Sequence, residues 1–435
     1  MKVLLVGSGG REHAIAQAIV RSDEAPMLYA AMSKKNPGIA GLCKDFQLIK
    51  ETDPRIVDYA VKNRVDLAVI GPEAVLAAGI PDMLWNAGIP VVGPRKSAAK
   101  IEFDKAWTRN FMKKYNIAGC PEFKIFRKGE DGSDEYIHDL KEVAIKPAGL
   151  TGGKGVRITG EHFDIHGAKA YAKEILKKDD LVIEEYLEGE EFTLQAFVDG
   201  KNLAFSPAVQ DHKRAYEGDK GPNTGGMGSY SDASDILPFM EESDYNEAKK
   251  IMRDAVGALE KETGIRYQGI LYGQFMAVSE GVRLVEFNAR FGDPEAMNIL
   301  PLLETDFLEV CLSIVNEELK NVSFKKQATV CKYAVPIGYP EHPVQDSVIE
   351  IKDVNDALLF YSSVYEKNNK IYSTSSRCLA VVGIANTIKE AESIAEAGIS
   401  GLKGEIFSRH DIGKEELIHK RIQHMQELRR SKLYK

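Results

Sequence analysis

A carboxylate and an amide are predicted to share one face of a strand near residue 286. Residues 284–288 read Leu-Val-Glu-Phe-Asn and follow a turn at Glu280 and Gly281, a pattern that favours a strand. Side chains two apart on a strand project from the same face, so Glu286 and Asn288 point together. Their oxygens are ligands of the kind that Mg²⁺ prefers when it also binds phosphates. A solvated strand face would show the same pattern, so this strand alone does not distinguish a metal site from an exposed polar face.

A glycine-rich segment with two lysines lies upstream, at residues 144–156. It reads Ala-Ile-Lys-Pro-Ala-Gly-Leu-Thr-Gly-Gly-Lys-Gly-Val, so Lys146 ends a short apolar run and Lys154 lies in the loop that follows. Glycines let backbone amides approach a phosphate chain, and a lysine adds a positive charge. This segment is not a P-loop, because Gly155 stands where a Ser or Thr is required. Taken alone, it is either a phosphate-binding loop or an ordinary hairpin turn.

The glycine-rich loop and the downstream Glu-x-Asn strand together resemble the arrangement of ATP-grasp enzymes, in which ATP lies between two α+β lobes. Residues 181–192, Leu-Val-Ile-Glu-Glu-Tyr-Leu-Glu-Gly-Glu-Glu-Phe, fit the same family. ATP-grasp enzymes use such a strand end to hold adenine through the backbone, and a carboxylate seven residues on to hold the ribose. Glu184 and Glu191 have this spacing. Without the resemblance the run would be a solvated acidic face, which remains our interpretation of Glu188 and Glu190.

The ATP-grasp resemblance implies a nucleotide site that several segments build. Lys105 matches the family lysine that reaches the phosphates, although a lysine on a helix surface is the alternative interpretation. Gln274 lies on the predicted neighbouring strand and is either a further metal ligand or an ordinary polar strand residue. The implied ligands of Mg²⁺ or Mn²⁺ are Gln274, Glu286 and Asn288. The implied ATP-binding residues are Lys105, Lys146, Gly152, Gly153, Lys154, Gly155, Glu184, Glu185, Leu187 and Glu191.

A longer block at residues 210–230 makes the resemblance more specific. It reads Gln-Asp-His-Lys-Arg-Ala-Tyr-Glu-Gly-Asp-Lys-Gly-Pro-Asn-Thr-Gly-Gly-Met-Gly-Ser-Tyr, and it occurs with Gly-Ser-Gly-Gly-Arg-Glu-His-Ala at 7–14 and Phe-Gly-Asp-Pro-Glu at 291–295. This combination resembles the phosphoribosylamine–glycine ligase family, from the first strand to about Ile412. The resemblance implies that ATP, glycine and 5-phosphoribosylamine give glycinamide ribonucleotide, ADP and phosphate through glycyl phosphate, an early step of purine biosynthesis.

The same resemblance implies roles for residues on the substrate side. The implied catalytic residues are Arg290, Lys146 and Lys154, which would neutralise charge in phosphoryl transfer and orient glycine. The implied substrate-binding residues are Gly9, Gly10, Glu73, Asp211, Lys213, Asn223, Thr224, Gly225 and Arg290. The chain departs from the family pattern at Ser375 and Ser376, in place of Gly-Gly, and at Ala148, where an acidic residue is common. These departures affect local loop contacts and leave the implied set of ATP-binding residues unchanged.

Repeated strand–turn–helix patterns predict how these residues are positioned. Apolar runs at 3–6, 67–70 and 89–92 each precede a glycine-containing turn, which indicates a doubly wound parallel sheet over residues 1–100. Gly9 and Glu73 follow two of its strands, so we expect them at the same edge of the sheet. The expected fold class is α/β and α+β multidomain.

The rest of the chain is expected to form two further domains. A two-lobed ATP-grasp core would occupy residues 101–325, with a small lid lobe at about 117–190. A small mixed β domain would follow at 326–435. One helix is predicted over 97–115, and a basic helix with Leu417, Ile418 and Met425 on its apolar side is predicted after Lys414.

Composition excludes several classes of partner. The chain has 435 residues and a formal net charge of −8, which argues against a nucleic-acid partner. No apolar stretch approaches the length of a membrane span or a signal-peptide core. The five cysteines show no paired spacing, which favours a reducing, cytoplasmic location. We expect only small-molecule partners, with the chain a monomer or weak homodimer.

Two other functional classes stay open at this point. Another ATP-grasp ligase or carboxylase acting on a different purine intermediate would share the nucleotide residues but lack the block at 210–230. A dinucleotide-dependent oxidoreductase, or a non-catalytic nucleotide sensor, would use the turn at 7–10. Glu12 stands where the dinucleotide fingerprint needs its third glycine, and no convincing ribose-binding acid follows the second strand.

Overall fold

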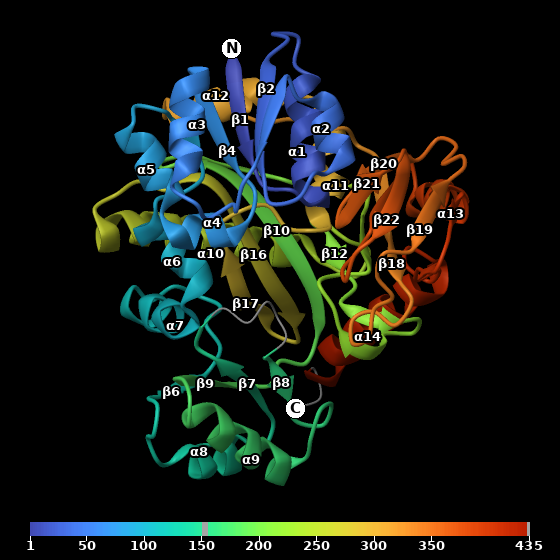
Figure 1. The fold of residues 1–435 in the computed structure, drawn as a ribbon. Coiled ribbons are helices and arrows are strands. Elements are labelled where there is room, and N and C mark those ends of the chain that lie inside the picture. The colour runs from blue at the N-terminus through green and yellow to red at the C-terminus, as the bar shows by residue number, and fades with distance from the viewer. Residues whose placement is uncertain (150–154, 433–435) are drawn as a thin grey trace.

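The computed structural model describes residues 1–149 and 155–432. Its N-terminal part is a five-stranded parallel sheet in the order β3-β2-β1-β4-β5, which confirms the predicted doubly wound sheet (Figure 1). Its elements are β1 (Lys2–Val6), α1 (Gly10–Val20), β2 (Met27–Met32), α2 (Pro37–Leu42), β3 (Asp45–Leu48), α3 (Arg55–Asn63), β4 (Leu67–Ile70), α4 (Glu73–Ala78), α5 (Ile80–Asn86) and β5 (Val91–Val92). The strand order reverses between β1 and β4, so the connections that follow these two strands leave toward opposite faces of the sheet. The edge between them is where ligands bind in such folds.

Two helices lead from this sheet into the next part of the chain. They are α6 (Lys96–Phe103) and α7 (Lys105–Lys114), where the sequence predicted a single helix over 97–115. The helix is interrupted at Asp104, whose backbone is extended and whose carboxylate accepts a hydrogen bond from the N–H of Trp107. A side chain that caps a new helix start competes with continuation of the old helix, and the single-helix prediction was therefore wrong.

A small lobe follows, at the bottom of Figure 1. Its antiparallel sheet has the order β6-β9-β7-β8 and carries two helices on one side. The elements are β6 (Phe123–Phe126), α8 (Ser133–Leu140), β7 (Val143–Pro147), β8 (Arg157–Ile158), α9 (Ile165–Leu176) and β9 (Leu181–Glu185). The lobe has a hydrophobic core of its own, formed by side chains such as Phe126, Val143 and Leu181.

The larger lobe is built on a four-stranded antiparallel sheet in the order β11-β10-β16-β17. Its elements are β10 (Glu190–Asp199), β11 (Leu203–Phe205), α10 (Glu242–Thr263), β16 (Gln268–Val278), β17 (Gly281–Asn288), α11 (Glu295–Ile299), the 3₁₀ turn η1 (Leu300–Leu302) and α12 (Phe307–Val315). The strand predicted around Glu286 is thus present, and β16 pairs with it as expected for Gln274. Two lobes with these sheets are the ATP-grasp core that the sequence predicted.

The C-terminal part contains two sheets, and one of them takes in strands from residues 210–231. That sheet has the order β12-β15-β18-β23-β20, with β25 added to β18. Its strands are β12 (Gln210–Asp211), β15 (Gly228–Ser231), β18 (Ala328–Pro336), β20 (Leu358–Tyr361), β23 (Leu379–Ala385) and β25 (Ile406–Phe407). The second sheet contains β19 (Val348–Ile351), β21 (Val364–Lys367), β22 (Lys370–Ser373) and β24 (Leu402–Lys403), and α13 (Ile388–Ser400) packs on β18 and β23.

Two elements connect the C-terminal part to the larger lobe. The hairpin β13 (Arg214–Tyr216) and β14 (Lys220–Asn223) lies between β12 and β15 in the chain. The last helix, α14 (Glu415–Lys432), contacts β10 and β16. Two of its basic residues form ion pairs within the protein: Arg421 pairs with Glu190 at 3.1 Å, and Arg429 pairs with Asp244 at 2.6 Å.

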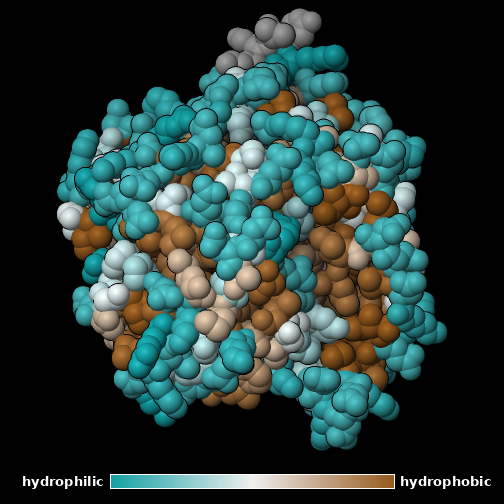
Figure 2. Space-filling view, turned by 90° about the horizontal axis from the view of Figure 1, so that it is seen from above, coloured by the Kyte–Doolittle hydropathy of each residue, from teal (hydrophilic) through white to brown (hydrophobic). Residues whose placement is uncertain are grey.

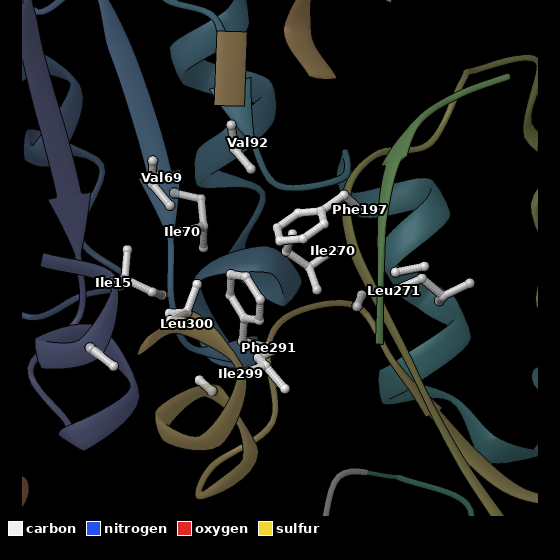
Figure 3. Close-up of a cluster of buried hydrophobic side chains, with 14 of the residues drawn as sticks. Ile15, Val69, Ile70, Val92, Phe197, Ile270, Leu271, Phe291, Ile299 and Leu300 are labelled. Carbon is white, nitrogen blue, oxygen red and sulfur yellow. The ribbon is translucent and has the colours of Figure 1, made fainter. Parts of the chain in front are cut away.

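One hydrophobic core joins the N-terminal sheet to the larger lobe. Figure 3 shows Ile15, Val69 and Ile70 of the N-terminal part facing Phe197, Ile270 and Phe291 of the larger lobe. All of these side chains are buried. The shared core holds the carboxyl edge of the parallel sheet against the ends of β16 and β17, which positions the polar residues described next.

Hydrophilic side chains cover much of the face seen in Figure 2. In the view of Figure 2, hydrophobic residues are visible only in patches between them, as is usual for folded proteins. Within the described residues, no helix combines the length and the apolar character needed to cross a bilayer.

Candidate active site

The turn after β1 is filled by the carboxylate of Glu12. The N–H of Gly9 donates to Glu12 Oε2 at 2.6 Å, and Arg11 Nε donates to Glu12 Oε1 at 2.6 Å. A Cβ atom at Gly7 or Gly71 would lie 2.4 Å or 2.2 Å from the Glu12 side chain. Burial raises the pKa of Glu12, and the charge of Arg11 opposes this. An internal carboxylate therefore occupies the place where a dinucleotide diphosphate would bind.

The predicted substrate-binding glycines lie at this sheet edge. The N–H of Gly9 donates to Glu12 in this structure, and the predicted substrate contacts of Gly9 and Gly10 stay predictions. Gly10 serves packing, since a Cβ there would lie 2.7 Å from the hydroxyl oxygen of Tyr333. Gly10 is the first residue of α1, and Gly9 and Glu73 follow β1 and β4 at the same edge of the sheet, as predicted.

Arg290 connects that sheet edge to the strand with the predicted metal ligands. Its guanidinium lies 3.0 Å from the Glu102 carboxylate and 3.6 Å from the Glu73 carboxylate. It also donates to Asn288 Oδ1 at 3.1 Å. Burial would lower the pKa of Arg290, but Glu102 and Glu73 outweigh it and raise the pKa. The Nε of Arg290 is buried and makes no hydrogen bond among the described residues.

The predicted metal ligands share one face of β16 and β17. Gln274 and Glu286 are cross-strand partners, and Asn288 Nδ2 lies 3.4 Å from Glu286 Oε1. Burial would raise the pKa of Glu286, but nearby lysines, led by Lys213 and Lys105, lower it, so this carboxylate is ionised. In the described part of the chain no cluster of three or more His, Cys, Asp or Glu side chains is arranged for a metal. One carboxylate with amide oxygens nonetheless suits Mg²⁺, which keeps waters and binds substrate phosphates.

The nucleotide side contains a buried charge cluster around Glu184. Arg109 donates to both of its carboxylate oxygens, at 2.6 Å and 3.0 Å, and Lys146 Nζ donates at 2.6 Å. Burial would raise the pKa of Glu184, but Arg109 and Lys146 hold it at about 2. The carboxylate of Glu184 thus fixes the position of Lys146. The prediction that this strand end holds adenine concerns its backbone, and it stays a prediction.

Other predicted ATP-binding residues surround this cluster. Lys105 begins α7, donates to the carbonyl of Gly149 at 3.1 Å and has a pKa lowered by burial. Glu185 ends β9 and accepts from the N–H of Glu122 at 2.9 Å, and Leu187 is half-buried just beyond. The carbonyl of Gly155 accepts from the hydroxyl of Tyr171 at 3.0 Å. The predictions for Gly152, Gly153 and Lys154 lie outside the described residues.

The predicted substrate residues gather around the β13–β14 hairpin. Lys213 pairs with Glu191 at 3.5 Å, and Gln274 donates to the same carboxylate at 2.7 Å. Glu191 therefore joins the metal strand to the hairpin. The Thr224 hydroxyl donates to the carbonyl of Lys213 at 2.8 Å, while Asn223 ends β14 opposite Arg214. The structure thus brings the predicted nucleotide, metal and substrate residues to one region between the lobes.

Comparison with known proteins identifies this arrangement. The three domain models of phosphoribosylglycinamide synthetase match the chain: the N domain at residues 1–102, the ATP-grasp (A) domain at 103–296 and the C domain at 329–415. The phosphoribosylamine–glycine ligase of Methanosarcina barkeri is 61% identical over 433 residues, covering 99% of this chain and 100% of that protein. The chain belongs to the phosphoribosylglycinamide synthetase family.

Further relatives agree with this family assignment. The phosphoribosylamine–glycine ligase of Methanosarcina acetivorans is 59% identical, with 99% of this chain and 98% of that protein covered. A crystal structure of the phosphoribosylamine–glycine ligase from Thermotoga maritima superposes with a TM-score of 0.78 at 27% identity, covering 94% of this chain and 100% of that chain.

Several residues of this family member were missed by the sequence analysis. Arg377 donates to the carbonyls of Gly225, Gly226 and Asp293 at 2.6, 3.2 and 3.1 Å, so it ties the hairpin loop to the turn before α11. Glu102 lies on the buried face of α6, beside Ala98 and Ala99. Helical periodicity places Glu102 on the side of the helix where apolar residues are expected. This was the only local sign that Glu102 has a functional role. Arg377 directly follows Ser375 and Ser376, where the chain departs from the family pattern.

Proposed function

We propose that the protein catalyses ATP-dependent ligation of glycine to 5-phosphoribosylamine, giving glycinamide ribonucleotide, ADP and phosphate in purine biosynthesis. The observation that carries this proposal is the shared face of β16 and β17, where Glu286 and Asn288 lie among the charges of Lys105, Lys146 and Lys213. Such a face suits transfer of a phosphoryl group, because phosphoryl transfer depends on positioning and on neutralisation of charge. Full-length relatives carry the matching enzyme name.

The first step that we propose activates the glycine carboxylate. A carboxylate is a poor electrophile because its own charge repels a nucleophile. Transfer of the γ-phosphoryl group to it breaks the bond to ADP and gives glycyl phosphate, whose phosphate is a good leaving group. Lys105 and Lys146 would stabilise the charge that develops on the phosphoryl oxygens. Mg²⁺ or Mn²⁺, held by Glu286, Asn288 and Gln274, would add positive charge at the same place.

The second step forms the amide. The amine of 5-phosphoribosylamine attacks the acyl carbon, a C–N bond forms, and phosphate leaves with the electron pair of the broken C–O bond. No covalent enzyme intermediate is required. The guanidinium of Arg290 lies beside Asn288 on this face, and we propose that its positive charge orients the carboxylate of glycine or the acyl phosphate.

An isotope experiment tests this mechanism. When glycine labelled with ¹⁸O in its carboxylate is used, one labelled oxygen should pass into inorganic phosphate for each amide formed, and the nucleotide product should be ADP. Mass spectrometry of the phosphate gives the label, and unlabelled glycine in ¹⁸O-water gives the control for exchange. Unlabelled phosphate, or AMP with pyrophosphate, would contradict the glycyl phosphate step even if glycinamide ribonucleotide is made.

Substrate omission separates the proposed function from the other classes. ADP formation should require both glycine and 5-phosphoribosylamine, whereas a carboxylase or a ligase for another purine intermediate would not respond to them. An oxidoreductase is disfavoured, because Glu12 fills the turn that a dinucleotide needs. We further propose that the protein is a monomer or weak homodimer and that it is cytoplasmic; the five free cysteines support the reducing location.

A further inference from the structure

The last helix, α14, carries an arginine on its packed side. Leu417 and Met425 are buried, and Arg421 lies four positions from each of them, on the same side of the helix. Basic residues of a surface helix normally face water. A guanidinium on the packed side of α14 is instead directed at partners inside the protein. α14 also follows the segment that the C domain model matches, which ends at residue 415.

The guanidinium of Arg421 binds two carboxylates from separate segments of the chain. One nitrogen pairs with Glu190 at 3.1 Å, and another donates to Asp219. The other oxygen of Glu190 lies 2.6 Å from Nδ1 of His424, one turn further along α14. Glu190 is 4% exposed, so its expected place on a solvated acidic face was wrong. The reason is that α14, which follows it by more than two hundred residues, covers this carboxylate.

Both carboxylates lie next to residues of the candidate active site. Glu190 and Glu191 begin β10, and successive residues of a strand project from opposite faces. Glu190 therefore faces α14, while the Glu191 carboxylate lies 3.5 Å from Lys213. Lys213 directly precedes β13, and Asp219 lies in the turn between β13 and β14. Arg421 thus holds both sides of the Glu191–Lys213 pair, one through the start of β10 and the other through the hairpin.

We propose that Arg421 is a positioning residue, which orients Glu191 toward the ribose of ATP by fixing the start of β10 against the hairpin. This inference rests on the proposed function and on the predicted contact between Glu191 and the ribose, and it assigns a role to α14. Arg421 contacts no substrate itself. Its effect is indirect, because a carboxylate that shifts by about 1 Å loses its hydrogen bonds to a bound ligand.

Discrimination between two nucleotides tests this role. In 2′,3′-dideoxy-ATP both ribose hydroxyls that a carboxylate could bind are missing, so the wild type should use it less well than ATP. In Arg421→Gln the ratio of kcat/KM for ATP to that for the dideoxy nucleotide should fall by about tenfold, and the KM for ATP should rise by a similar factor. A merely structural role would reduce the amount of folded enzyme, which lowers kcat for both nucleotides alike and leaves the ratio unchanged.

A double-mutant cycle shows whether Arg421 acts through Glu191. Glu191→Gln should lower the nucleotide ratio by itself, because the carboxylate that recognises the ribose is gone. Adding Arg421→Gln to it should then lower the ratio by less than about twofold further, since no carboxylate is left to be positioned. Two independent effects would multiply. The ratios are measured from phosphate release at saturating glycine and 5-phosphoribosylamine.

Two further variants of α14 serve as controls. Arg429 lies on the same side of the helix but pairs at 2.6 Å with Asp244, which belongs to α10. Arg429→Gln should therefore affect thermal unfolding and leave the nucleotide ratio within about twofold of the wild type. Arg421→Lys keeps the positive charge without the guanidinium fork, so it should restore part of the ratio that Arg421→Gln loses.

The outcomes separate this inference from the proposed function. If the wild type releases no phosphate from ATP with glycine and 5-phosphoribosylamine, the proposed function fails and the inference fails with it. If the wild type is active but Glu191→Gln or Arg421→Gln keeps the nucleotide ratio, only the inference is overturned. An equal fall in Arg429→Gln would also overturn it, since the effect would then be general to α14. If Arg421→Gln does not fold, Glu190→Gln removes the other member of the pair, and an unchanged ratio in that variant overturns the inference.

Discussion

Glu286→Ala is expected to lower turnover by about a hundredfold or more while the protein stays folded. Glu286 is the only charged group among the three predicted metal ligands, and the lysines around it lower its pKa, so it is ionised when metal and ATP bind. Without it the metal loses an anionic ligand, and the phosphoryl oxygens lose the positioning that the metal supplies. Steady-state rates of ADP formation at saturating Mg²⁺ measure the effect.

A graded series of variants makes this prediction specific to the metal. Glu286→Gln keeps an oxygen ligand without the charge, so its loss of turnover should be smaller and should be partly recovered by higher Mg²⁺. Glu188→Ala removes an exposed glutamate and should leave turnover unchanged. Far-UV circular dichroism and thermal unfolding show whether each variant is folded. Turnover of Glu286→Ala within a few-fold of the wild type would refute the assignment of Glu286 to the metal.

Glu184→Gln is expected to destabilise the folded protein by about 3 kcal/mol at neutral pH, because it leaves Arg109 and Lys146 buried without their anion. Glu184 has a pKa of about 2 in the folded protein, against an ordinary value of 4.5. Because this pKa is lower in the folded protein, the ionised carboxylate stabilises the fold at pH values above the pKa of the unfolded chain. That stabilisation is lost as the pH falls from about 4.5 to about 2. The difference in unfolding free energy between wild type and variant should therefore shrink in acid.

Chemical unfolding at a series of pH values measures this difference. Asp180→Asn serves as the control, because Asp180 pairs with Arg127 at 2.6 Å on the exposed surface of the same lobe. An exposed pair contributes little, so this variant should differ from the wild type by less than about 1 kcal/mol. A Glu184→Gln variant as stable as Asp180→Asn at neutral pH would show that the buried cluster does not hold the lobe together.

Much of this site could be predicted because it follows from local patterns. Side chains two apart on a strand must share a face, and so Glu286 and Asn288 do lie together on β17. The alternation of strand, turn and helix indicated the parallel sheet, and its strand order brings Gly9 and Glu73 to one edge. Periodicity also identified the buried side of the last helix, where Leu417, Ile418 and Met425 are buried.

Other features depend on residues that are distant in the chain and that only the tertiary structure brings together. Arg109 and Glu184 are 75 positions apart, and Glu102 of α6 pairs with Arg290, which follows β17. The sequence placed Glu184 at a strand end expected to hold adenine through its backbone, but no local pattern indicated that Arg109 and Lys146 would bind its carboxylate.

The sequence by itself therefore determined the family, the strand faces and the types of chemical group present. Only the tertiary structure decided which of those groups are committed to each other and which are open to a ligand. The N–H of Gly9 is taken by Glu12, while Asp211 Oδ1 is left without a partner among the described residues. The physical reason is that backbone periodicity is a local property, whereas desolvation and charge pairing depend on every group within a few ångströms, whatever its position in the chain.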